Sequence, residues 1–163
     1  MSGCGWELDS LINCFFIVFC MRLGVLFSGG KDSCLALARV LEEGQDVVCL
    51  ITVQSQNKDS FMFHTPNVNL AVRQAEAIGI PLVQGNTKGE KEIELKDLKD
   101  VILKAKKKYD LDGIVTGAIA STYQASRIQK ICDELKLKCV NPLWGMEQEK
   151  LLKELIERKI EVY

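Results

Sequence analysis

The residues that most clearly favour chemistry form one short stretch between two apolar patterns. They are Ser28, Gly29, Gly30, Lys31, Asp32 and Ser33. The apolar residues 24–27 precede them, and the helix-like pattern CLALARVL follows them. Adjacent glycines cost backbone entropy, so they suit a loop that needs positive φ or close approach by another group. The ammonium, carboxylate and hydroxyl groups around them indicate that this group is charged.

A loop between a strand and a helix is a natural anion site, because backbone N–H groups and the positive end of the helix dipole meet there. The glycines let the backbone close on phosphate oxygens, Ser28 and Ser33 offer hydroxyl donors, and Lys31 adds a positive charge. Asp32 would repel phosphate unless a cation bridges them, which predicts Mg²⁺. The stretch fits neither G-x-x-x-x-G-K-[ST] nor G-x-G-x-x-G. The alternative is an ordinary strand–helix turn with Ser28 as the N-cap.

A second motif, GAIASTYQASR, lies at residues 117–127. If the strand expected before it lies beside the first strand, Gly117 and Ala118 leave room for a nucleotide. Ser121 and Gln124 form a capping-box pattern at the start of a helix, and the alternative is that they only cap it. Arg127 suits a phosphate or carboxylate, and its alternative is a surface salt bridge.

Alternating periodicity predicts five strands and five helices. The strands are expected at residues 22–27, 46–53, 81–84, 113–116 and 138–140, and the helices at 33–43, 67–78, 92–109, 122–135 and 146–158. Strands that are apolar on both faces, separated by helices, indicate a parallel sheet with helical crossovers. We therefore expect a doubly wound α/β fold, a parallel sheet sandwiched by helices. Such folds bind ligands beyond the carboxyl ends of the strands, where the strand order reverses.

The two ends of the chain do not fit this pattern. The largely apolar residues 11–21 are too short for a membrane span of about 20 residues, and Met21 directly precedes the first strand. We expect residues 1–20 to be an extension outside the domain; a targeting signal is the alternative. Residues 159–163 look like the opening of another strand, so we expect a C-terminal portion to be missing.

Composition narrows the function classes. With a net charge of −1, the chain lacks the excess positive charge that is typical of a dedicated nucleic-acid-binding protein. The seven cysteines include no C-x-x-C pair and there is a single histidine, so a zinc site is unsupported. Cysteines inside expected strands and helices fit a reducing cytosol, and we expect a cytoplasmic protein without a membrane partner.

The stretch SGGKDS resembles the PP-loop of the N-type ATP pyrophosphatases, which split ATP into AMP and pyrophosphate. FMFHTPNV at residues 61–68, the segment 113–132 and NPLWG at 141–145 are similar to the diphthine–ammonia ligase family of archaea and eukaryotes. The resemblance covers residues 21–163 and implies one Rossmann-like, adenine nucleotide alpha hydrolase-like ATP-binding domain.

The resemblance also implies a reaction and its participants. ATP adenylates the diphthine carboxylate of translation elongation factor 2, and ammonia displaces AMP to give diphthamide. The implied cofactors are ATP and Mg²⁺, and the partners are this elongation factor and ammonium, without nucleic acid. A homo-oligomer is left open. Because the family's chains continue past residue 163, we expect ATP binding but weak or absent diphthamide formation.

The chemistry of the residues and the family resemblance together predict a set of site residues. The catalytic residues are Lys31, Asp32 and Arg127, with Asp32 at the metal. The ATP-binding residues are Ser28, Gly29, Gly30, Lys31, Asp32, Ser33, Val53, His64, Gly117, Ala118, Ser121 and Gln124. His64 could pair a phosphate or be an ordinary loop histidine. Capping is the favoured role of Glu90 and Glu92 over Mg²⁺ binding, and packing is favoured for Tyr123 and Trp144.

Two alternative functions remain open at this point. One is another PP-loop enzyme, such as a tRNA-modifying one, and the other is a nucleotide-binding fragment without catalysis. A thiolase would need a reactive cysteine pair. Cys132 and Cys139 have six residues between them across a helix end, which predicts poor geometry. The weak basic balance also disfavours tRNA.

Overall fold

A five-stranded parallel sheet forms the centre of the molecule. The structure, a computed structural model, describes residues 20–55, 68–88 and 91–160. The strands are β1 (Arg22–Leu26), β2 (Asp46–Ser55), β3 (Leu82–Thr87), β4 (Gly113–Val115) and β5 (Lys138–Val140). Their order in the sheet is β3-β2-β1-β4-β5, and every neighbouring pair is parallel.

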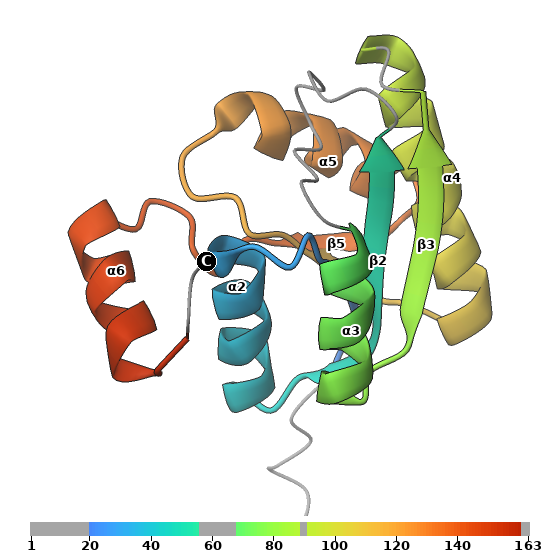
Figure 1. Cartoon of the computed structure of the whole chain (residues 1–163). Coiled ribbons are helices and arrows are strands. Elements are labelled where there is room, and N and C mark those ends of the chain that lie inside the picture. Colours follow the sequence, from blue (N-terminus) through green and yellow to red (C-terminus); the bar gives the residue numbers. More distant parts are fainter. Residues whose placement is uncertain (1–19, 56–67, 89–90, 161–163) are drawn as a thin grey trace, which may run out of the picture.

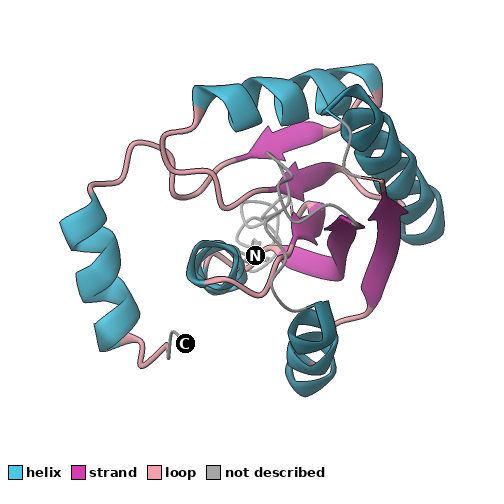
Figure 2. Cartoon of the chain, turned by 45° about the horizontal axis from the view of Figure 1, so that its top comes forward, coloured by secondary structure: helices cyan, strands magenta, loops and turns pink. Residues whose placement is uncertain are grey.

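Helices cover both faces of this sheet (Figures 1 and 2). They are α2 (Lys31–Glu42), α3 (Val68–Ile78), α4 (Lys91–Tyr109), α5 (Thr122–Glu134) and α6 (Gln148–Glu157). One buried cluster joins the sheet to α2, α3 and α6, and a second joins it to α4 and α5. The expected doubly wound α/β fold is therefore confirmed. Among the described residues, none of the helices is both long and apolar enough to cross a membrane.

The central strands are apolar on both faces because each face meets a helical layer. Successive side chains of a strand point to opposite faces. In β1, Leu23 and Val25 contribute to the cluster with α2, whereas Leu26 packs against the cluster with α4. In β2, Leu50 contributes to the cluster with α2, and Ile51 contributes to the cluster with α4. Continuous apolar strands are thus the sequence pattern that this two-sided burial requires.

The strand order reverses beside β1. The chain passes outward from β1 to β2 and β3, then crosses to the other side of β1 to form β4 and β5. Leu23 pairs with Gly113, and Val25 with Val115, so β1 and β4 leave the sheet at the same level. The loops that follow these two strands therefore face each other, as the sequence predicts.

Several element boundaries differ from the expected ones. Helix α2 begins at Lys31, so the polar residues Lys31, Asp32 and Ser33 form its first turn. Strand β3 continues through Gly85 to Thr87, where β2 remains its partner. Gly85 fits there because a Cβ would lie 2.0 Å from Cγ2 of Val101 on α4.

The strand expected to begin at residue 159 is wrong for the two described residues. Lys159 has a φ of 54° just after α6, and Ile160 belongs to no strand. Its amide donates to the carbonyl of Leu155 and closes the helix end. Residues 161–163 and residues 1–19 lie outside the described residues.

Helix α6 is attached to α2 by apolar contacts and by an ionic network. Leu151 and Leu155 are buried against the α2 side of the core. Arg39 of α2 donates to both carboxylate oxygens of Glu154 and to the carbonyl of Pro142 (2.9 Å). Glu154 also accepts a hydrogen bond from Arg158 (2.9 Å). The hydrogen bond from Arg39 holds the pKa of Glu154 below its usual range.

We expect Glu154→Gln to lower the free energy of unfolding at pH 7 by about 1–3 kcal/mol, because Arg39 loses its charged acceptor. Since the folded-state pKa of Glu154 is depressed, its stabilisation is present above the pKa of the unfolded carboxyl, about 4.3. That stabilisation is lost as the pH falls through the folded-state pKa. Urea denaturation of the wild type and the variant at pH 7 and at pH 3 measures the difference in unfolding free energy at each pH.

The matched control is Glu149→Gln on the same helix, where the ion pair with Lys153 is largely exposed. This variant should change the unfolding free energy by less than about 0.5 kcal/mol. An equal effect of the two substitutions, or a Glu154→Gln effect that does not shrink in acid, would contradict the assignment.

Candidate functional site

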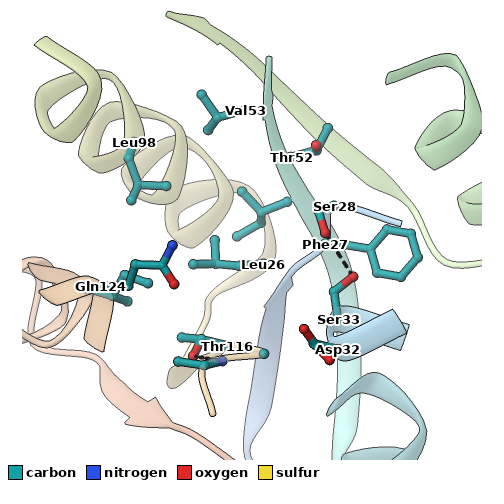
Figure 3. Close-up of a pocket in the computed structure, with 14 residues that line it drawn as sticks. Leu26, Phe27, Ser28, Asp32, Ser33, Thr52, Val53, Leu98, Thr116 and Gln124 are labelled. Atoms are coloured by element: carbon teal, nitrogen blue, oxygen red, sulfur yellow. Dashed lines mark hydrogen bonds between the residues drawn. The ribbon is translucent and has the colours of Figure 1, made fainter. Parts of the chain in front are cut away.

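A pocket of about 320 Å³ opens at the carboxyl edge of the sheet, at the point where the strand order reverses. Its walls come from the ends of β1, β2 and β4 and from helices α2, α4 and α5. Figure 3 shows Gln124 and Leu98 on the opposite side of the pocket from Asp32 and Ser33. The lining residues are Leu26, Phe27, Ser28, Asp32, Ser33, Ile51, Thr52, Val53, Leu98, Thr116, Gly117, Ala118, Gln124 and Ile128.

The loop after β1 is held by hydrogen bonds among its own residues. The hydroxyl of Ser33 donates to the carbonyl of Gly30 (2.9 Å), which leaves it an acceptor for the hydroxyl of Ser28 (3.2 Å). The N–H of Gly30 donates to Oγ of Ser28 (3.3 Å). Gly30 is the N-cap of α2, with extended backbone angles and no side-chain cap hydrogen bond. Ser28 is therefore not the N-cap, and the first amides of α2 are available to an anion.

Lys31 and Asp32 form an ion pair with each other. Nζ of Lys31 lies 2.8 Å from Oδ1 and 2.9 Å from Oδ2 of Asp32, and both side chains are about one-third exposed. Asp32 lines the pocket, whereas Lys31 reaches it only through this pair. The carboxylate of Asp32 thus faces the space where a bound anion and its counter-cation would lie.

Gly117 brings the second loop against the first turn of α2. A Cβ on Gly117 would lie 3.0 Å from the carbonyl carbon of Asp32 and 3.0 Å from the amide nitrogen of Ser33. The neighbouring amide of Ala118 donates to Oγ1 of Thr116 (3.1 Å), and both residues line the pocket. Gly117 therefore permits close contact between the two loops, in addition to lining the pocket as the sequence predicts.

Of the three site residues expected at α5 and its N-cap, one lines the pocket and two lie outside it. Oγ of Ser121 accepts a hydrogen bond from the amide of Gln124 (3.3 Å), so Ser121 is the N-cap of α5. The side chain of Gln124 lines the pocket. The guanidinium of Arg127 stacks 3.4 Å from the ring centre of Tyr123 and donates to its carbonyl. The catalytic role of Arg127 stays a prediction.

One end of the pocket carries Ser28, Asp32 and Ser33, and the opposite end carries Leu98 together with Gln124 (Figure 3). Serine and aspartate side chains, with the loop after β4, form the polar end. Leu26, Ile51, Val53, Leu98 and Ile128 supply apolar surface. Val53 was expected from the sequence, whereas the other four are buried or half-buried apolar residues that cannot be told from ordinary core residues in the sequence.

Gln74 of α3 contacts the glycine loop and was missed in the sequence. Its Nε2 donates to the carbonyl of Gly29 (3.3 Å), which also accepts a bond from Sγ of Cys34 (3.7 Å). Gly29 has a φ of 78°, and a Cβ there would lie 2.3 Å from Oε1 of Gln74. Gly29 thus satisfies the left-handed backbone and the close approach that the sequence predicts for this loop.

Cys132 and Cys139 lie near enough to affect each other's pKa, and whether their geometry suits a reactive pair stays a prediction. Their side chains share a hydrogen bond, which raises the pKa of Cys132 and lowers the pKa of Cys139. Asn141 links this pair to the pocket, because its Nδ2 donates to Sγ of Cys139 (3.8 Å) and its Oδ1 accepts from Thr116 (2.6 Å).

Several expected residues add nothing to the described site. His64 and Glu90 lie outside the described residues, as does the side chain of Glu92. Trp144 is 47% exposed, so the expected packing role does not bury it in the core. In the described part of the chain, no cluster of three or more histidine, cysteine or acidic residues is placed to hold a metal.

Two solved structures share this fold. One is a predicted subunit of a tRNA methyltransferase from Methanocaldococcus jannaschii, with a TM-score of 0.54 and 21% identity over 84% of this chain and 75% of that one. The other is a U34-tRNA thiolase from Methanococcus maripaludis with a [4Fe-4S] cluster, with a TM-score of 0.53 and 14% identity over 88% of this chain and 59% of that one. At these identities the likeness concerns the fold alone.

Sequence relatives identify the family. Residues 21–139 match the family described as the diphthamide synthase N-terminal domain, and the chain belongs to this family. It is 33% identical to a diphthine–ammonia ligase of Rattus norvegicus and 31% identical to one of Homo sapiens, over 86% of this chain and 60% of each relative. The Schizosaccharomyces pombe relative is 32% identical, with 25% of its length covered. The chain thus spans about 60% of the mammalian relatives.

We expect Gly117→Ala to lower the free energy of unfolding by about 1–3 kcal/mol, because the new methyl group presses on helix backbone that cannot move aside. Thermal or urea denaturation measures this effect. Gly30→Ala is the matched control, since its Cβ would meet only Oγ of Ser28, at 3.4 Å. Equal stability of the Gly117→Ala variant and the wild type would contradict the close contact between the loops.

We expect Gln74→Ala to weaken the binding of ATP and inorganic pyrophosphate by about fivefold, because the Gly29 carbonyl loses a hydrogen-bond donor worth about 1 kcal/mol. Adenosine, which carries no phosphate, should bind both proteins equally. Isothermal calorimetry compares the three ligands, with the exposed neighbour Arg73→Ala as control. An unchanged pyrophosphate affinity would show that Gln74 does not position the loop.

Proposed function

We propose that this chain is the ATP-binding, adenylating part of a diphthine–ammonia ligase. The family match and the names of the relatives support this proposal. The observation that carries it is the meeting of two distant motifs at one pocket. The SGGKDS loop supplies uncapped amides, and the loop at Gly117 packs against them at backbone distance.

The two ends of the pocket suit the two halves of ATP. In the proposed complex the phosphates lie at the polar end, on the first amides of α2 and the hydroxyls of Ser28 and Ser33. The adenine ring lies on the apolar surface, between residues such as Val53 and Leu98. Gln124 lies across from the loop and offers both a donor and an acceptor to the nucleotide.

The proposed reaction has two displacements. A carboxylate oxygen of diphthine attacks the α-phosphorus of ATP, the α–β phosphoanhydride bond breaks, and pyrophosphate leaves. The nitrogen of ammonia then attacks the acyl carbon, AMP leaves, and the nitrogen loses a proton to give the amide. Charge grows on the departing pyrophosphate in the first step. The amides at the start of α2, the hydroxyls of Ser28 and Ser33, and the ammonium of Lys31 are suited to stabilise it.

Asp32 is the described residue best suited to hold Mg²⁺ with ATP. Its carboxylate lines the pocket, and Mg²⁺ in phosphate sites is commonly bound through one or two carboxylates together with phosphate oxygens. When bound, the ion would neutralise phosphate charge. Lys31 shields the same carboxylate in the free protein, so ligand binding releases its ammonium for the phosphates.

The protein substrate and the location complete the proposal. We propose that the full reaction uses elongation factor 2 carrying diphthine, and ammonium, in the cytoplasm. The surface that recognises a folded protein needs about 800 Å² per partner, more than a nucleotide pocket supplies. Recognition of the elongation factor therefore requires protein surface outside the nucleotide pocket.

We expect Asp32→Asn and Lys31→Ala to weaken ATP binding in different ways. Asp32→Asn should remove the increase in ATP affinity that Mg²⁺ provides, because it removes the carboxylate that faces the phosphates. Lys31→Ala should weaken ATP about tenfold with or without Mg²⁺, because a charge-assisted bond is lost. Calorimetry with ATP, with and without Mg²⁺, separates these effects, and the exposed Lys150→Ala is the control.

Failure of the wild type to bind ATP at millimolar concentration would contradict the nucleotide site. The substrate is tested separately, by pyrophosphate release with diphthine-bearing elongation factor and with tRNA. The ligase proposal predicts release with the elongation factor only. Release with tRNA would instead favour a tRNA-modifying enzyme, and release with neither would favour a nucleotide-binding fragment.

A further inference from the structure

Glu94 of α4 is a buried acidic residue without a described partner. Only 1% of its surface is exposed, and it ranks among the fully buried side chains of the protein. Nothing in the described part of the chain donates a hydrogen bond to its Oε1. Glutamate is almost never fully buried unless it is paired, because removing a carboxylate from water is costly. An orphaned buried acceptor of this kind indicates a missing donor.

Helix periodicity places Glu94 beside the pocket. Glu94, Leu98 and Ile102 are buried at four-residue spacing, so they share the face of α4 that packs on the sheet. Leu98 lines the pocket. Glu94 lies four residues before it, about 6 Å nearer the start of the helix. Figure 1 shows that α4 begins at the level of the arrowheads of β2 and β3, which is the carboxyl edge of the sheet.

The contact between Gly85 and Val101 fixes the level of Glu94 independently. A Cβ on Gly85 would meet Val101, so β3 and α4 cross at these residues. Glu94 is two helical turns from Val101, about 10.5 Å along α4. Strand β3 ends at Thr87, about 6.6 Å beyond Gly85. Glu94 therefore lies just past the end of the strand, at the edge where the pocket opens.

The chemistry of the site favours a small cation with N–H donors. No group of three or more acidic, histidine or cysteine residues accompanies Glu94 within the described residues. Mg²⁺ demands near-octahedral oxygen coordination and gives up its water reluctantly. A single buried carboxylate with an unpaired oxygen matches a singly charged ion that donates hydrogen bonds in several directions.

We propose that Glu94 binds the ammonium ion consumed in the ligase reaction. This inference rests on the proposed function, which makes ammonium a substrate. The carboxylate supplies the charge and the acceptor that ammonium needs, one helical turn from Leu98, which lines the pocket across from the phosphate loop. The exocyclic amino group of adenine presents the same N–H chemistry, so the experiment has to distinguish the two.

Glu94→Gln should have two opposite effects. In the free protein it replaces an unpaired buried charge with a neutral group of the same shape, so the melting temperature should rise by about 3 °C or more. A glutamate kept for structural reasons would instead give a lower melting temperature. In the presence of ammonium the variant should lose the stabilisation that the ligand gives to the wild type.

The experiment compares melting temperatures in ammonium chloride and in sodium chloride at equal ionic strength, with ATP·Mg²⁺ present. At ten times its Kd, ammonium should raise the wild-type melting temperature by about 3 °C or more. Glu94→Gln should show no such rise. The matched control is Asp100→Asn, an exposed carboxylate on the same helix, which should respond as the wild type does.

Three results would overturn the inference. They are an equal ammonium shift in wild type and Glu94→Gln, no ammonium shift in the wild type, and a loss of ATP affinity in Glu94→Gln with the ammonium shift intact. The last result would assign Glu94 to the adenine amino group. Calorimetric titration of the wild type with ATP tests the nucleotide site separately. Normal ATP binding without an ammonium effect therefore overturns the role of Glu94 alone.

Discussion

The backbone contact between Gly117 and the first turn of α2 is the constraint on which the site depends. It brings the loop after β4 so near the first turn of α2 that a Cβ on Gly117 would lie 3.0 Å from backbone atoms of Asp32 and Ser33. The parallel pairing of β1 with β4 sets the level at which these loops leave the sheet. Because the N-cap Gly30 provides no side-chain acceptor, the amides of α2 remain available at this junction. The proposed anion site therefore depends on the pairing of β1 with β4 and on the packing of Gly117 against α2.

Two polar side chains beside the pocket carry buried oxygens without a described donor. They are Gln74, against the glycine loop, and Glu94, at the start of α4. Each such group costs stability in the free protein, since water is excluded and no protein group replaces it. The ionic network of Arg39 and Glu154, on the far side of α2, shows the opposite arrangement, in which each charge is paired. Buried polar atoms without a donor are typical of a site in which part of the stability is given up for ligand binding.

The fold and the main loop could be predicted from the sequence because they depend on local patterns. Apolar strands between helices indicated the parallel sheet, and SGGKDS marked the turn after its first strand. Gln74 could not be predicted, because its contact with Gly29 requires α3 and the loop to be placed in space. The contact between Cys132 and Cys139 could not be predicted for a related reason. Lys136, with a φ of 53°, reverses the chain tightly enough to bring β5 back alongside α5.

Amide chemical-shift mapping by NMR, first with inorganic pyrophosphate and then with ATP·Mg²⁺, tests the central claim that the two loops form one phosphate site. The account predicts that pyrophosphate shifts the amides of Gly29 to Ser33 together with those of Gly117 and Ala118. ATP should additionally shift Val53 and Leu98, which supply apolar surface to the pocket. ATP binding that leaves the amides at the start of α2 unchanged would contradict the account.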